Sequence, residues 1–171
     1  MEQEITQRRK RPVFLTIICI LSFVYIGIEL ISNISGLAMG PLTKNEMKVL
    51  SKEWNKQKEM VKKTAPSAES SDWIPVFEKV EAYQVTRNNN HYLASIIDFF
   101  TYVVGLIGVF FMFRGRRLGF HLYIVYSLMA LGGTYLYVSP GAIPTVLIGF
   151  IAFFSLLFIS FYALNLKWMK N

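Results

Sequence analysis

Two carboxylates inside long apolar stretches are the residues of this sequence best placed to do chemistry. Glu29 and Asp98 are the only acids within these stretches. An ionisable side chain in a bilayer is costly and commonly marks an ion pathway or a proton relay. Two carboxylates that meet in such surroundings would favour a single shared proton, because both cannot easily ionise together.

Polar residues at helical spacing accompany both acids. As helices, the two stretches place Asn33 one turn from Glu29 and Ser95 one turn from Asp98. Each carboxylate then lies roughly 9 to 10 Å from the outer membrane boundary. We therefore predict two polar stripes that face each other or a shared wet cavity. The stripes comprise Ser22, Tyr25, Glu29, Ser32, Asn33 and Gly36 on the first helix, and His91, Ser95, Asp98, Tyr102 and Gly105 on the second.

Two interpretations of this polar intramembrane set remain open. In the first, Glu29 and Asp98 form a proton or cation relay that opens to the outer side. In the second, the set joins the two helices and hydrogen-bonds the outer segment through Arg87 or His91, since interhelical hydrogen bonds contribute about 0.6 to 2 kcal/mol. The second is favoured because both acids lie nearer the interface than the bilayer midplane, where transporters usually bind substrate.

Other residue types give little support for catalysis. Cys19 is the single cysteine, so the chain forms no internal disulfide or paired-thiol redox centre. His91 and His121 fall at opposite membrane faces and cannot share a metal ion. No phosphate-binding Gly-rich loop occurs. We therefore expect a protein that is not an enzyme, with no catalytic residues, no metal and no cofactor.

Four long apolar runs must position these residues. Of the 171 residues, 53% are hydrophobic and 17% are charged, a balance typical of membrane proteins. Each run has roughly 21 to 23 residues and covers the ~30 Å hydrocarbon core as a helix. The predicted transmembrane helices are 13–35, 92–113, 118–138 and 145–166. The first exceeds the apolar region of a signal peptide, so we expect an uncleaved anchor. Gly133 and Gly149 suit close helix packing.

Basic residues predict the orientation of these helices. Lys and Arg collect on the cytoplasmic side of short loops. They are frequent in the tail 1–12, the loop 114–117 and the end 167–171, but absent from the outer turn 139–144. We therefore expect an inner-membrane protein of a bacterium with both termini in the cytoplasm. The arginines expected to fix this topology and to contact lipid headgroups are Arg8, Arg9, Arg11, Arg114, Arg116 and Arg117. The net charge of +7 is scattered, which argues against nucleic-acid binding.

The extracytoplasmic segment 36–91 is expected to contain two amphipathic helices, at about 43–64 and 72–86. Thr43 and Glu46 form a capping box at the start of the first. Apolar side chains at helical spacing give a candidate partner surface of Met47, Leu50, Trp54, Trp73 and Phe77. Two such helices cannot bury a core of their own. The surface could cap the bundle, dock another protein or lie at the lipid interface.

Two short segments carry a resemblance to a known group of proteins. The start "KRPVFLTIICILSF" and the segment "MFRGRRLGFHLYIVY" resemble recurring pieces of small four-span bacterial inner-membrane proteins. In those proteins a basic turn followed by Gly-Phe-x-x-Tyr enters the third span, and here these positions are Gly119, Phe120 and Tyr123. The resemblance implies the four-span architecture and brings no catalytic residues.

The sequence as a whole predicts an all-α polytopic membrane protein, with four transmembrane helices and a helical extracytoplasmic domain between the first two. We expect an accessory or scaffold protein without catalysis, whose candidate partners are membrane lipids and a protein bound through the outer helices or the transmembrane faces. The alternative is a small proton- or cation-linked transporter or channel component that uses Glu29 and Asp98.

Overall fold

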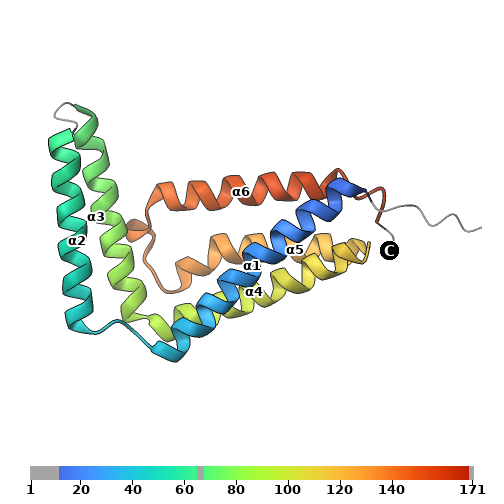
Figure 1. Cartoon of the computed structure of the whole chain (residues 1–171), viewed down its shortest axis with the longest axis horizontal. Helices are drawn as coiled ribbons and strands as arrows, with labels where there is room; N and C mark the ends of the chain where they lie inside the picture. The colour runs from blue at the N-terminus through green and yellow to red at the C-terminus, as the bar shows by residue number, and fades with distance from the viewer. Residues whose placement is uncertain (1–11, 65–67, 170–171) are drawn as a thin grey trace, which may run out of the picture.

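The computed structural model describes residues 12–64 and 68–169, and within these ranges the chain is all-helical. Figure 1 shows a bundle of four helices, α1, α4, α5 and α6, with a hairpin of α2 and α3 lying across one end of it. In chain order the elements are α1 Val13–Met39, α2 Lys44–Thr64, α3 Ala68–Asn89, α4 His91–Phe113, α5 Arg117–Gly132, the 3₁₀ helices η1 Gly133–Leu136 and η2 Pro140–Ala142, and α6 Thr145–Ala163.

Three of the described helices, α1, α4 and α6, are long and apolar enough to cross a membrane. This property indicates a membrane protein. α1 runs four residues beyond the predicted 13–35 and stops at Gly40, whose φ of 78° is readily adopted by glycine. α6 ends at Ala163, where 145–166 was expected.

The predicted helix 118–138 takes a different form. α5 has only 16 residues, or about 24 Å of α-helix. It ends at Gly132 and continues as the 3₁₀ helix η1. Two successive glycines, Gly132 and Gly133, have low helix propensity, which accounts for the change at this point. α5 is therefore the one bundle helix that falls short of the length of a membrane span as a regular α-helix.

The main core of the bundle extends toward the turn 114–116, and we call this end of the molecule the arginine end. Its buried side chains come from all four bundle helices: Leu15, Ile18, Cys19, Ile26, Val109, Met112, Tyr123, Tyr126 and Tyr162. The hydroxyl of the fully buried Tyr162 donates to Ser22 Oγ at 2.8 Å. A buried tyrosine needs such a partner, and this bond fixes α6 against α1.

Glycines bring α4 and α5 into close contact within this core. A Cβ added to Gly119 would fall 2.5 Å from the Gly108 carbonyl oxygen and closer still to the Met112 backbone nitrogen. No side chain fits there, so the two backbones touch directly, as small residues allow in membrane helices. The expectation of close packing at Gly149 is wrong, because nothing lies within 4 Å of a Cβ at that position.

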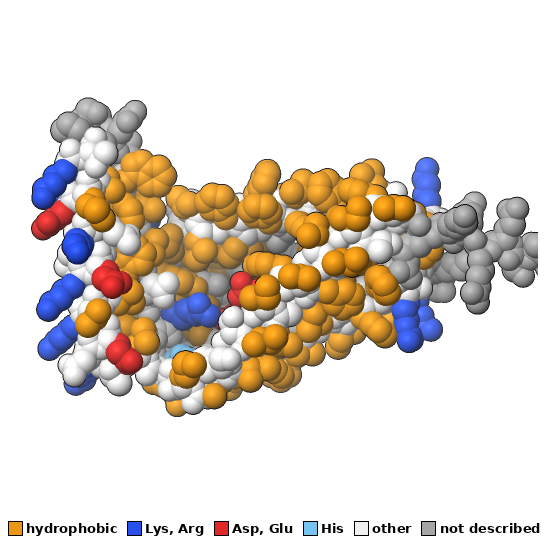
Figure 2. All heavy atoms as spheres, viewed as in Figure 1, with side chains coloured by type: hydrophobic (Ala, Val, Ile, Leu, Met, Phe, Trp, Pro, Cys, Tyr) orange, Lys and Arg blue, Asp and Glu red, His pale blue; other side chains and the backbone are white. Residues whose placement is uncertain are grey.

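The opposite end of the bundle, which we call the hairpin end, is covered by α3. Tyr83 of α3 is buried in a second apolar cluster with Ala94, Tyr137, Val138 and Ile143. The Asn90 side-chain amide, just after α3, donates to the Tyr137 carbonyl oxygen at 3.1 Å. Figure 2 shows Lys and Arg side chains on the hairpin face that points away from the bundle and again at the arginine end, with a largely hydrophobic surface between. This distribution fits two aqueous faces separated by lipid.

Candidate functional site

A cleft at the hairpin end brings several of the predicted residues together. It has a volume of about 400 Å³ and lies between α1, α3 and α4. We call it the polar cleft, because polar residues predominate in its walls, among them Glu29, Asn33, Arg87, His91, Ser95 and Tyr102. Three residues of the predicted intramembrane set, Glu29, Asn33 and Ser95, thus line one opening, whereas Asp98 does not line it.

Asp98 is held by a cation from the hairpin. Arg87 Nη2 of α3 donates to Asp98 Oδ2 of α4 at 2.7 Å. The Asp98 side chain is 20% exposed and the Arg87 side chain is 41% exposed, so the pair is partly shielded from solvent. A charge-assisted contact of this length restrains both side chains. It ties the hairpin to the bundle, which is the structural role considered for Arg87 in the sequence.

Glu29 has a much weaker partner. The Tyr102 hydroxyl donates to Glu29 Oε2 at 3.5 Å, which is longer than an ordinary O–H···O hydrogen bond. One turn along α1, the Asn33 Oδ1 atom is buried and has no hydrogen-bond partner. Buried polar atoms are usually paired. The polar cleft therefore contains two acceptor groups whose capacity is unfilled.

His91 contacts the backbone of α1 in the wall of the polar cleft. His91 Nε2 lies 3.1 Å from the Gly36 carbonyl oxygen, a carbonyl of the last turn of α1. That carbonyl also accepts from the Gly40 backbone nitrogen at 2.9 Å. The His91 ring thus joins the beginning of α4 to the end of α1.

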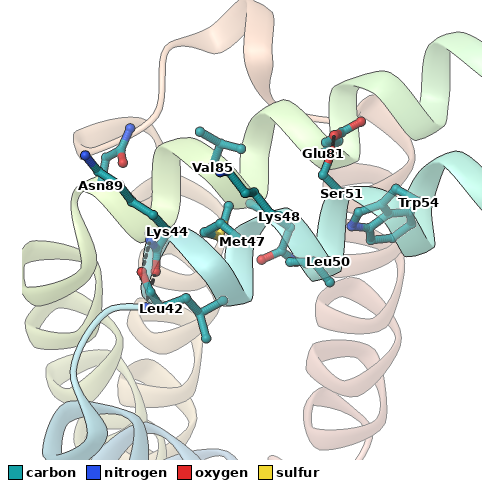
Figure 3. Close-up of a pocket in the computed structure, with 12 residues that line it drawn as sticks. Leu42, Lys44, Met47, Lys48, Leu50, Ser51, Trp54, Glu81, Val85 and Asn89 are labelled. Atoms are coloured by element: carbon teal, nitrogen blue, oxygen red, sulfur yellow. Dashed lines mark hydrogen bonds between the residues drawn. The ribbon is translucent and has the colours of Figure 1, made fainter.

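The predicted partner surface lies mostly within the hairpin. Figure 3 shows Met47, Leu50 and Trp54 of α2 beside a groove that Glu81 and Val85 of α3 also line. The groove has a volume of about 490 Å³. The rings of Trp54 and Phe77 lie 6.1 Å apart between centroids. Trp73 differs from these residues because it is 54% exposed. Most of the predicted partner surface therefore lies between the two hairpin helices, whereas Trp73 lies outside this contact.

Polar contacts also hold the hairpin closed. The Lys58 ammonium and the Ser51 hydroxyl each donate to a different oxygen of Glu81 at 2.7 Å. Both bonds hold the pKa of Glu81 below its ordinary value, and the bond from Lys58 has the larger effect. At the start of α2, the Glu46 carboxylate accepts from both the Thr43 hydroxyl and its backbone nitrogen at 2.7 Å, which confirms the predicted capping box.

The arginine end has its own set of contacts. The Arg114 guanidinium lies 4.6 Å from the Phe110 ring centroid, and Arg116 lies 5.8 Å from that of Phe111. Arg117 Nε donates to the Met169 carbonyl oxygen at 3.2 Å. Arg114, Arg116 and Arg117 thus cluster at one end of the bundle. The predicted residues Arg8, Arg9 and Arg11 lie outside the described residues.

A second cleft was missed by the sequence analysis. It has a volume of about 390 Å³, opens between α1 and α6, and has α5 as its floor. We call it the apolar cleft; its lining includes Leu21, Tyr25, Tyr126, Ala130, Phe154 and Phe158. One lining residue, Tyr25, was already part of the predicted polar stripe of α1. Helical periodicity does not show that α6 leaves this face of α1 open.

The polar contacts of the polar cleft are hydrogen bonds and an ion pair. Within residues 12–64 and 68–169, no group of three or more His, Cys, Asp and Glu side chains could hold a metal ion. No protein-family model, curated protein or solved structure matches this chain.

Proposed function

We propose that the chain is an integral membrane accessory or scaffold protein of the bacterial inner membrane, which assembles with partner proteins or lipids and performs no catalysis. The observation that supports this proposal best is the Arg87 to Asp98 ion pair at 2.7 Å. The pair lies within the chain and holds the hairpin on the bundle, so it gives the intramembrane acid a structural role. A relay would instead need Asp98 to exchange its proton freely.

Four crossings, with the termini in the cytoplasm and the hairpin outside, belong to the same proposal. α5 supplies about 24 Å of helix and η1 adds about 8 Å. Their combined length is sufficient for the ~30 Å hydrocarbon core. The arginines of the turn 114–116 then lie on the cytoplasmic side, as the distribution of basic residues predicts. α2 and α3 lie on the opposite side, where their lysines face water.

Cysteine labelling tests this topology. Single cysteines at Lys56, Gly141 and Lys167 are introduced into a Cys19→Ala background, and cells are treated with a membrane-impermeant maleimide. Four crossings predict that K56C and G141C react in intact cells and that K167C reacts only after permeabilisation. If α5 does not cross, G141C is protected and K167C is labelled. Labelling of K167C with protection of K56C would invert the whole arrangement.

Site-specific photo-crosslinking tests the accessory role. A photoreactive residue is placed at the exposed Lys52 of α2, at Trp73 of α3, or at Phe153 of α6, which is 61% exposed. A scaffold predicts a discrete protein adduct from at least one of these faces. Lipid adducts alone at all three positions would contradict assembly with a partner protein and would leave lipids as the partners.

A proton- or cation-linked transporter or channel component remains the second candidate, and the weakly paired Glu29 carboxylate in an open cleft is the observation that favours it. The two candidates differ in what Glu29→Gln and Asp98→Asn do in reconstituted vesicles. A transporter loses ion-dependent flux while its fold and assembly are kept. A scaffold loses assembly or abundance and has no flux to lose.

A further inference from the structure

The polar and apolar clefts lie along the same side of α1. Glu29 lines the polar cleft, and Tyr25, one turn earlier, lines the apolar cleft together with Ser22. Residues four apart on a helix lie on the same face. One face of α1 thus passes from a charged, hydrogen-bonding opening to an apolar one within about 6 Å of helix length.

The polar cleft is suited to a ligand that donates hydrogen bonds and carries positive charge. Its unfilled groups are acceptors: the Glu29 carboxylate, whose contact with Tyr102 is 3.5 Å long, and the buried Asn33 Oδ1 atom. An ammonium group has three donors and no acceptor, which complements these two groups.

The same cleft also contains a cation that can meet an anion. Arg87 lines it, and only its Nη2 atom donates to Asp98. A guanidinium has five N–H donors, so donors remain for a phosphate. The cleft therefore offers an acidic group and a basic group to a single zwitterionic molecule.

The apolar cleft indicates the chemistry of the rest of this zwitterionic molecule. It opens between α1 and α6, and its rim residues Leu21, Tyr25 and Phe154 are between 50% and 59% exposed. Both helices are long and apolar enough to span a membrane. At this depth the surrounding medium consists of lipid chains, so an acyl chain is the occupant that the environment supplies.

We propose that the two clefts together bind one phospholipid whose headgroup ends in a primary ammonium. The ammonium lies against Glu29 and Asn33, the phosphate meets Arg87, and one acyl chain enters the apolar cleft beside Tyr25 and Phe154. This inference requires that the bundle lies in a membrane, but it does not depend on the accessory role or on the identity of a protein partner.

Lipid retention measured by native mass spectrometry tests the site. The full chain, purified in mild detergent, is titrated with phosphatidylethanolamine and, separately, with phosphatidylcholine of the same acyl chains. The trimethylated headgroup keeps the positive charge and loses every N–H donor. Wild-type protein should bind the primary amine at least about tenfold more tightly, as expected when charge-assisted hydrogen bonds are lost. Equal retention of the two lipids, as a non-specific lipid shell would give, overturns the proposal without any variant.

Variants then assign the residues. Glu29→Gln should abolish the discrimination between the two headgroups, whereas Glu59→Gln, which changes an exposed acid on α2, should leave it intact. Ser155→Phe, which fills the apolar cleft, should weaken binding of both lipids about equally. Discrimination that survives Glu29→Gln, or retention that Ser155→Phe leaves unchanged, contradicts the assignment of the headgroup or of the chain.

Discussion

The two ends of the bundle are built from different interactions. At the arginine end, the core is apolar and aromatic, Tyr162 and Leu15 are fully buried, and α4 touches α5 backbone to backbone at Gly119. At the hairpin end, polar groups join the helices, and the polar cleft remains open between them. Close packing at one end can fix the arrangement of helices, because backbone contacts tolerate no slippage. The other end is then free to carry charged groups and an opening.

The largest expected effect is at the α4 to α5 contact. Gly119→Ala should destabilise the protein by about 3 kcal/mol, because its new methyl group meets the backbone of α4 and can be accommodated only by separating the helices. Reversible unfolding in mixed micelles measures the change. Gly149→Ala is the matched control, since it meets nothing within 4 Å and should be neutral or slightly stabilising. Equal effects of the two substitutions would show that the arginine end is not the tighter one.

A smaller effect is expected at the hairpin end. Arg87→Gln should cost about 2 kcal/mol, because it leaves the Asp98 carboxylate partly buried without its cation. Hydrogen exchange of α3 should rise more than that of α6, since the ion pair fastens α3 to α4. Adding Asp98→Asn to Arg87→Gln should recover part of the loss, as a double-mutant cycle of two contacting residues requires. A purely additive double variant would mean that the pair contributes nothing.

The smallest effect concerns pH and the hairpin itself. The Lys58 and Ser51 hydrogen bonds lower the pKa of Glu81, so their stabilisation is fully present above the ordinary carboxyl value of 4.5 and is lost as the pH falls through the lowered value. The loss should be about 0.2 to 1 kcal/mol, as for other pairs near a surface. It is measured as lower protection of the α2 amides against hydrogen exchange at low pH, after correction for the intrinsic exchange rate at each pH. Glu81→Gln should remove this pH dependence, and a variant that keeps it would assign the effect to another group.

The sequence could predict the faces of the helices but not how they rotate against one another. Apolar length identified α1, α4 and α6, and the Thr-x-x-Glu spacing identified the cap at Thr43. Helical spacing also indicated that Glu29, Asn33 and Ser95 share a surface. It could not decide between a carboxylate pair and separate partners, because that depends on the docking of α3, which the sequence of α1 and α4 does not contain.

The remaining differences have separate physical causes. Hydropathy treats glycine as compatible with an apolar run, so hydropathy alone did not show the change from α5 to η1 at Gly132, although Gly132 and Gly133 together suggested a joint as an alternative to packing. The Tyr162 to Ser22 bond joins residues far apart in the chain, and the Gly108 to Gly119 approach depends on how α5 turns back against α4. No spacing rule predicts such contacts. The apolar cleft was missed for the same reason, since it is a property of the position of α6.

The base of the hairpin is held at more than one point, and this has a mechanical consequence. The Asn88 side chain both accepts from the Leu42 backbone nitrogen at 2.7 Å and donates to its carbonyl oxygen at 3.1 Å. Arg87, the neighbouring residue, is bonded to α4. A helix of 21 residues such as α2 is about 32 Å long. The hairpin therefore extends about that length from a base that is fixed at two points. A force applied far from this base exerts a torque on α4, the helix that carries Asp98.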